Sequence, residues 1–132
     1  TPHPAELARL CGVTVGEVMS DRLGFACKLA KKYDVTVLAR SADTFAVSGE
    51  RVYLCTEGTT ALAKGGSGDM LAGIVSSYCA QGCEAIDAAA LGSYTLGSAA
   101  ALAGYKHSER GVIARDIIDA LPRFLYELES SD

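Results

Sequence analysis

The residues best suited to chemistry form a glycine-rich run that ends in an acidic side chain, Gly65-Gly66-Ser67-Gly68-Asp69. An apolar segment with helical spacing follows, so the run predicts a loop that leads into a helix. The first N–H groups of a helix lack partners, and together with the helix dipole they favour an anion. Glycines let a phosphate approach the backbone closely. Asp69 could then act as a base beside that phosphate.

Two common phosphate-binding motifs do not describe this run. A Walker A loop needs Lys after its glycines, whereas Lys64 precedes them, and Leu71 stands where a Rossmann fingerprint has its third glycine. A structural explanation also stays open, because an acidic residue in a first helical turn is favourable on dipole grounds alone. Lys64 itself has two interpretations, a surface lysine at the loop mouth or a phosphate ligand.

Composition narrows the function classes. The 132 residues suit a single domain, which we place at residues 1–132. The net charge of −4 and the lack of Trp offer neither a basic surface nor a stacking platform for nucleic acid. Residues 88–105 are uncharged but rich in Ala, Gly and Ser, so we reject a membrane span there.

The cysteine and histidine content argues against disulfide bonds and metal centres. The five cysteines are odd in number, and their spacing does not match that of a disulfide-rich fold, which favours free thiols in a reducing cytoplasm. With only two histidines, no zinc pattern assembles, and we assign no metal-ligating residue.

Helical and strand patterns alternate along the chain. Thr14 to Glu17 has the form of a capping box, and we expect it to open one long helix to about Tyr33. The other expected elements are helices at 4–10, 67–81, 84–103 and 112–128, with Pro122 as a kink or restart, and strands at 35–39, 44–48 and 51–55. Small side chains recur every four residues at Ala85, Ala89, Ser93, Gly97 and Ala101, which predicts close approach of a neighbouring helix.

This alternation indicates an α/β layered sheet. One strand and one hairpin are too few to cover so many helices. We therefore expect that an N-terminal portion with further strands is missing and that the chain is a fragment. Its first residue, Thr1, favours the same interpretation.

Two segments together resemble a known family. Residues 1–10, TPHPAELARL, resemble the TPHPGE-type segment of the NAD(P)H-hydrate dehydratases, which are ribokinase-like proteins related to YjeF and to carbohydrate kinases. Residues 58–75 are similar to that family's glycine-rich signature and the helix after it. The resemblance covers nearly the whole chain. It implies a ribokinase-like layered sheet, mainly parallel, with helices on both faces, of which this chain is the C-terminal part.

The resemblance also implies a reaction. Such enzymes are lyases that restore NADH or NADPH from the hydrated cofactor, with ADP or ATP and Mg²⁺. The hydroxyl of the hydrate is phosphorylated, and the phosphate is then eliminated. The expected ligands are thus NAD(P)H-hydrate and an adenine nucleotide. A homo-oligomer, tetrameric in this family, and a fused or separate epimerase domain are also implied.

Site residues follow by match to the family's motifs. Asp69 is implied to be the catalytic base, and both Asp69 and His3 to contact the hydrated substrate. Gly66, Ser67 and Gly68 are implied to offer N–H groups to the phosphoryl oxygens. The AMP part of the nucleotide is implied to lie at Ala39, Arg40, Ser41, Ala42 and Asp43.

Three departures from the family pattern leave alternatives open. Ala39-Arg40 replaces Lys-Gly, Thr59 replaces Asn, and Ala5 replaces Gly. Arg40 can compensate for the lost lysine charge from the next position. The first alternative is a small-molecule kinase of the same fold that phosphorylates a sugar or vitamin precursor. The second is a catalytically degenerate domain kept for nucleotide sensing or assembly.

Overall fold

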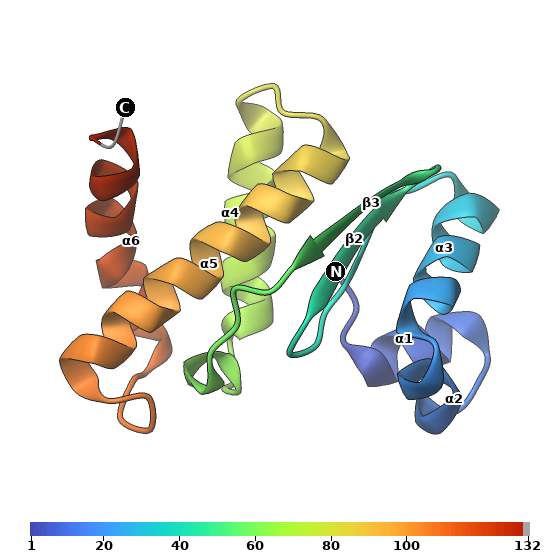
Figure 1. Ribbon diagram of the computed structural model, residues 1–132, viewed down its shortest axis with the longest axis horizontal. Helices are drawn as coiled ribbons and strands as arrows, with labels where there is room; N and C mark the ends of the chain where they lie inside the picture. The colour runs from blue at the N-terminus through green and yellow to red at the C-terminus, as the bar shows by residue number, and fades with distance from the viewer. Residues whose placement is uncertain (131–132) are drawn as a thin grey trace.

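The computed structural model describes residues 1–130, and its elements form two helical groups around a small sheet (Figure 1). Helices α1 to α3 lie at one end, helices α4 to α6 at the other, and the β2–β3 hairpin lies between them. In chain order the elements are α1 (Pro4–Cys11), α2 (Val15–Ser20), α3 (Arg22–Tyr33), β1 (Val37–Ala39), β2 (Thr44–Ser48), β3 (Arg51–Cys55), the 3-10 helix η1 (Thr60–Leu62), α4 (Ser67–Ala80), α5 (Ala85–His107) and α6 (Ala114–Glu129).

The sheet has the order β1-β2-β3, and both pairs of strands are antiparallel. Val37 is opposite Val47, and Phe45 is opposite Leu54. The predicted hairpin is thus confirmed, with its turn at Gly49, whose φ of 57° suits glycine. The mainly parallel sheet implied by the resemblance is not formed within residues 1–130, whose strands are antiparallel.

Helices cover both faces of this sheet, as the layered α/β prediction requires. Side chains of successive strand residues point to opposite faces. Val37 and Ala39 therefore join a buried cluster with α1, α2 and α3, whereas Leu38 between them joins a cluster with α4, α5 and α6. The short strand β1 is buried along its whole length. It links the two halves of the core.

The predicted long helix over 14–33 is wrong, because the chain breaks at Asp21. Thr14 does cap α2, and its capping box with Glu17 is confirmed. Asp21 then leaves the helical region, with φ −151° and ψ 62°, and its carboxylate accepts a 2.9 Å hydrogen bond from the Gly24 N–H. An Asp side chain that satisfies a first-turn N–H favours a new helix start over continuation.

The small-residue stripe on α5 does not form one continuous helix contact. Ala85 and Ala101 are exposed, and a Cβ on Gly97 would lie 1.9 Å from the Glu57 carbonyl oxygen, a loop atom. The close approach to α4 is made instead at Gly92, where a Cβ would lie 2.5 Å from Val75.

The two C-terminal helices also differ from their predicted bounds. Helix α5 runs four residues beyond the predicted end at 103, to His107, and α6 continues through Pro122 without a restart. Within residues 1–130, no helix combines the length and the apolar character that crossing a membrane requires.

Candidate functional site

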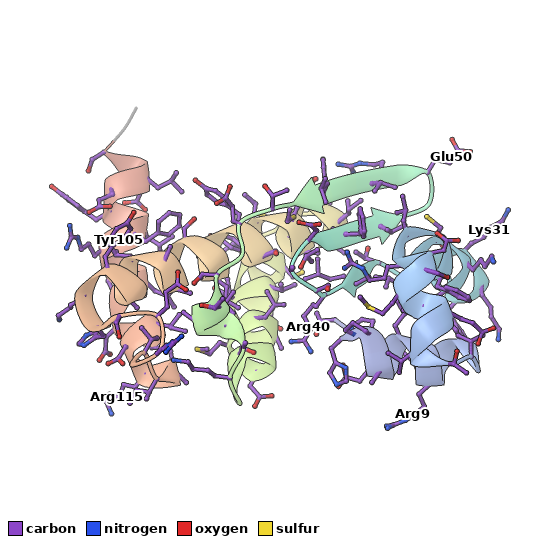
Figure 2. The ribbon with its side chains drawn as sticks, turned by 60° about the horizontal axis from the view of Figure 1, so that its bottom comes forward. Arg9, Lys31, Arg40, Glu50, Tyr105 and Arg115 are labelled. Carbon is purple, nitrogen blue, oxygen red and sulfur yellow. The ribbon has the colours of Figure 1, made fainter. Side chains whose placement is uncertain are left out.

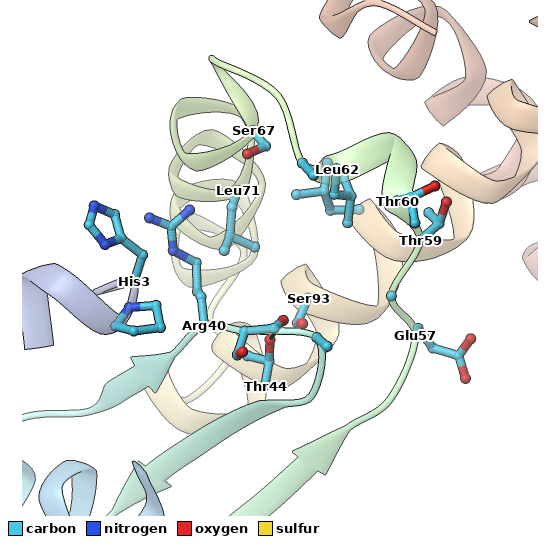
Figure 3. A pocket seen from close by; sticks show the side chains of 16 residues that line it. His3, Arg40, Thr44, Glu57, Thr59, Thr60, Leu62, Ser67, Leu71 and Ser93 are labelled. Atoms are coloured by element: carbon cyan, nitrogen blue, oxygen red, sulfur yellow. Dashed lines mark hydrogen bonds between the residues drawn. The ribbon is translucent and has the colours of Figure 1, made fainter. Parts of the chain in front are cut away.

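A cavity of about 530 Å³ opens where the start of α1, the β1–β2 turn, η1 and the N-terminus of α4 meet. Figure 3 shows His3 and Arg40 on one side of it, Ser67 and Leu71 above, and Thr59 and Thr60 opposite. Its wall combines apolar surface from Leu62, Leu71 and Leu96 with hydroxyls from Ser41 and Thr44. Such a mixture suits a small organic ligand with a few polar groups.

The glycine-rich loop leads into a helix at Ser67, as predicted. Gly66 precedes that helix with φ 92° and ψ −14°, a left-handed conformation that glycine adopts without steric cost. No side chain caps α4. The Ser67 N–H donates to the Lys64 carbonyl at 3.5 Å, whereas the next N–H groups of the first turn, at Gly68 and Asp69, have no intrahelical acceptor and remain available to an anion.

Asp69 lies in the first turn of α4, exposed to solvent. It is not among the residues that line the cavity. Successive helical residues are turned by about 100°, so Asp69 lies about 200° around α4 from both Ser67 and Leu71, which do line it. The carboxylate and the cavity are thus on different sides of the same helix end.

The predicted nucleotide segment is divided between the cavity and its surroundings. Arg40, Ser41 and Ala42 line the cavity. Ala39 is buried within β1. Asp43 is exposed outside the cavity, and its main-chain carbonyl accepts a 2.6 Å hydrogen bond from Arg22.

Arg40 connects the N-terminal segment to the start of α4. Its main-chain N–H donates to the Pro2 carbonyl (2.9 Å), and its Nε donates to the Thr1 carbonyl (2.7 Å). Nη2 lies 3.5 Å from the Glu6 carboxylate. A Cβ on Gly68 would lie 2.9 Å from Nη1, so Gly68 leaves room for the guanidinium. A cation beside a positive helix end favours an anion between them.

His3 has a structural role that the sequence analysis missed. It is the N-cap of α1, and its Nδ1 accepts hydrogen bonds from the N–H groups of Ala5 (3.2 Å) and Glu6 (3.3 Å). The His3 N–H donates in return to the Glu6 carboxylate at 2.8 Å, a bond that lowers the pKa of Glu6. Because Nδ1 accepts, the neutral ring carries its proton on Nε2, which lies 3.2 Å from Glu6. The spacing of His3 and Glu6 was the available signal.

Two further cavity residues, Gly58 and Thr59, lie in the segment that resembles the family's glycine-rich signature, and the sequence analysis gave neither a binding role. A Cβ on Gly58 would lie 2.8 Å from the Ala42 carbonyl oxygen, so only glycine fits this backbone contact. Thr59 caps η1 by accepting a hydrogen bond from the Ala61 N–H at 3.1 Å. Both line the cavity. Lys64, in contrast, is half-buried and bonded to the α5–α6 loop rather than placed in the cavity.

Comparisons with known proteins agree with this geometry. A family model described as NAD(P)H-hydrate dehydratase matches residues 1–123. The bifunctional NAD(P)H-hydrate repair enzyme Nnr of Moorella thermoacetica is 39% identical over 130 residues, which are 98% of this chain and 24% of that protein. The ADP-dependent (S)-NAD(P)H-hydrate dehydratase of Neisseria meningitidis is 41% identical over 101 residues, 76% of this chain and 34% of that protein.

A solved structure shares the fold. It is the ADP/ATP-dependent NAD(P)H-hydrate dehydratase from Bacillus subtilis, co-crystallised with ATP and Mg²⁺. The TM-score is 0.89 at 29% identity, over 96% of this chain and 46% of that one. The predicted fold class is confirmed, and the chain spans less than half the length of these relatives. With its family model matched over residues 1–123, this chain belongs to the NAD(P)H-hydrate dehydratase family.

Proposed function

We propose that this chain supplies the nucleotide-binding part of an enzyme that restores NADH or NADPH from its hydrate at the expense of ADP or ATP. The observation that carries the proposal is the cavity at the N-terminus of α4, with Arg40 on its wall. The relatives named ADP-dependent dehydratase, and the relative crystallised with ATP and Mg²⁺, support the same assignment.

The cavity suits an adenine nucleotide. Leucine side chains on its wall offer apolar surface to the base, and the hydroxyls of Ser41 and Thr44 offer polar contacts to the sugar. The phosphates then extend toward Arg40 and the first-turn N–H groups of α4 after the Gly66 cap, that of Gly68 and that of Ser67, which is shared with the Lys64 carbonyl at 3.5 Å. These donors stabilise the charge that develops on a transferring phosphoryl group.

Asp69 acts on the hydrated cofactor, whereas His3, which lines the cavity, lies on the nucleotide side. The hydroxyl of the hydrate attacks the terminal phosphorus, the bond from that phosphorus to its bridging oxygen breaks so that AMP leaves from ADP or ADP leaves from ATP, and the Asp69 carboxylate accepts the hydroxyl proton. Phosphate is a far better leaving group than hydroxide, so its elimination, together with a proton from the neighbouring ring carbon, restores the nicotinamide ring. The position of Asp69 across the helix end from the cavity supports this division, with the nucleotide on one side of the transferred phosphoryl group and the hydrate on the other.

Magnesium fits this arrangement as a companion of the nucleotide. Residues 1–130 contain no group of three or more His, Cys, Asp or Glu side chains that could hold a metal ion. Mg²⁺ keeps several waters and is commonly bound through substrate phosphates with one or two carboxylates. When bound, it would neutralise phosphate charge, and Asp69, the acidic residue in the first turn of α4, would be a carboxylate at that helix end.

The wider assembly is part of the same proposal. We expect a cytoplasmic homo-oligomer. Apolar side chains exposed on α6, among them Ile118 and Leu128, support association of subunits. The bifunctional name of the Moorella relative supports a fused companion domain.

Recovery of reduced cofactor tests the reaction. The intact protein is incubated with purified NADH hydrate, Mg²⁺ and either ADP or ATP, and the near-ultraviolet absorbance of NADH is followed. We expect recovery that depends on the nucleotide. Recovery with neither nucleotide, while calorimetry shows that both bind, would favour the degenerate sensing domain over the enzyme.

A further inference from the structure

Lys64 stands directly before the two glycines of the phosphate loop, but its ammonium is committed elsewhere. Nζ donates to the main-chain carbonyl of Glu109 at 3.1 Å and to that of Val112. Both acceptors lie in the loop between α5 and α6, more than forty residues further along the chain. Lys64 is half-buried and is not among the residues that line the cavity.

Two other contacts lie close to these bonds. The Thr60 hydroxyl donates to the Glu109 carboxylate. At the end of the glycine-rich loop, a Cβ on Gly66 would lie 3.7 Å from the Ala114 side chain. The α5–α6 loop therefore contacts η1 at Thr60 and the residue before the glycines at Lys64, and the first residue of α6 lies beside the end of the glycine-rich loop.

The α5–α6 loop is itself fixed by internal bonds. Ser108 holds φ 64°, a conformation that persists in a non-glycine residue only where its surroundings enforce it. Its carbonyl accepts hydrogen bonds from the N–H groups of Gly111 and Val112, both at 3.1 Å. Val112 is fully buried. A loop held in this way can serve as a fixed support for the segment that contacts it.

Lys64 also connects to α4 through its own carbonyl. That oxygen accepts a 3.0 Å hydrogen bond from the Ser67 hydroxyl and a longer one, at 3.5 Å, from the Ser67 N–H. One residue thus ties the first residue of α4 to the α5–α6 loop. Moving its ammonium to a phosphate would break both charge-assisted bonds to the carbonyls, each stronger than a neutral hydrogen bond.

We propose that Lys64 and Glu109 are positioning residues that hold the glycine-rich loop in its ligand-ready shape, and that Lys64 is not a phosphate ligand. The consequence for nucleotide binding rests on the proposed function. The support itself does not, because its contacts lie within this chain. The proposal gives a role to the α5–α6 loop, although this loop contributes no residue to the cavity wall.

Amide hydrogen exchange of the intact protein without nucleotide tests the support directly. We expect exchange across residues 59–67 to be about 10-fold faster in Lys64→Met and in Glu109→Ala. Lys64→Arg, which can still donate to both carbonyls, recovers the protection. Arg110→Ala is the matched control, since Arg110 is an exposed neighbour without a side-chain hydrogen bond or ion pair inside residues 1–130. Unchanged exchange in Lys64→Met would overturn the proposal.

A double-mutant cycle on ADP affinity separates positioning from direct contact. Lys64→Met removes the bonds to the two main-chain carbonyls, and Glu109→Ala removes the bond from the Thr60 hydroxyl. If both sets of bonds hold the glycine-rich loop in place together, each variant weakens ADP binding about 10-fold, and the double variant loses little more. A phosphate-ligating Lys64 would instead give multiplying losses, about 100-fold in the double variant, which contradicts the proposal. A wild-type protein that binds neither ADP nor ATP contradicts the proposed function, and the exchange experiment then decides on the support alone.

Discussion

Replacement of Arg40 by Gln is expected to weaken the binding of nucleotide phosphates while leaving the binding of the nucleoside intact. The guanidinium lies against the start of α4, where a Cβ on Gly68 would be 2.9 Å from Nη1. Figure 2 shows Arg40 in the space between α1 and α4, whereas Arg9 points away from it at the bottom of the view. Arg40 is thus the cation placed to meet a phosphate bound at that helix end.

The magnitude follows from the surroundings of the side chain. A hydrogen bond to a charged group contributes about 1.5–3 kcal/mol, and the Arg40 side chain, 21% exposed, is partly screened by solvent and shares its charge with Glu6 at 3.5 Å. We therefore take the lower half of that range, about 2 kcal/mol, which corresponds to a roughly 30-fold rise in the Kd for ADP.

Calorimetric titration of the intact protein with adenosine, AMP and ADP measures this effect. We expect adenosine affinity to change less than about 2-fold in Arg40→Gln, and Arg40→Lys to recover part of the ADP affinity, because lysine keeps the charge without the planar fork. Arg9→Gln is the control. Wild-type ADP affinity in Arg40→Gln would show that Arg40 does not meet the phosphates. An equal loss for adenosine would contradict the phosphate contact as well, because the Arg40 side chain would then act by holding Thr1 in place.

Two other perturbations test local features of the site and of α1. Gly58→Ala pushes a Cβ to 2.8 Å from the Ala42 carbonyl, and we expect about 1–3 kcal/mol lower unfolding free energy in urea. Gly73→Ala, a helical position with nothing within 4 Å, should gain about 0.5–1 kcal/mol, and equal effects of the two would contradict the packing argument. The pKa of Glu6 lies below its usual 4.5 because the carboxylate accepts from the His3 N–H, so this stability is present above pH 4.5 and is lost as the pH falls through the folded-state pKa. Acid titration of unfolding should therefore show a steeper loss below pH 4.5 in wild type than in Glu6→Gln, and parallel curves would argue against the bond.

Local patterns in the sequence predicted the elements that present the site. The glycine-rich run predicted the start of α4 at Ser67, and the flanks of Gly49 predicted the β2–β3 hairpin. The helix over 14–33 failed because periodicity continues across Asp21, and only the cap bond to Gly24 shows that the backbone turns there. A side chain that competes for a backbone donor leaves no trace in hydrophobic spacing.

Contacts between segments far apart in the chain could not be predicted from the sequence. Lys64 binds main-chain carbonyls 45 and 48 residues away, and carbonyls carry no residue-specific signal. The approach of Arg40 to Gly68 likewise depends on how β1 meets α4. For His3 a short-range signal existed in its spacing from Glu6, but histidine is an uncommon cap. The sequence thus indicated which residues belong to the site, but not which groups they bind in the folded chain.

Asp69, a carboxylate at the start of α4, is the group that we propose to drive phosphoryl transfer to the cofactor hydrate. The most direct measurement compares wild type with Asp69→Asn in the intact protein, with NADH recovered from its hydrate and ADP affinity both recorded. The amide keeps the shape of the side chain but cannot accept the hydroxyl proton, so we expect recovery to fall by about 10²-fold or more with ADP affinity unchanged. Asp69→Asn that restores NADH at the wild-type rate would contradict the role of Asp69 as the base.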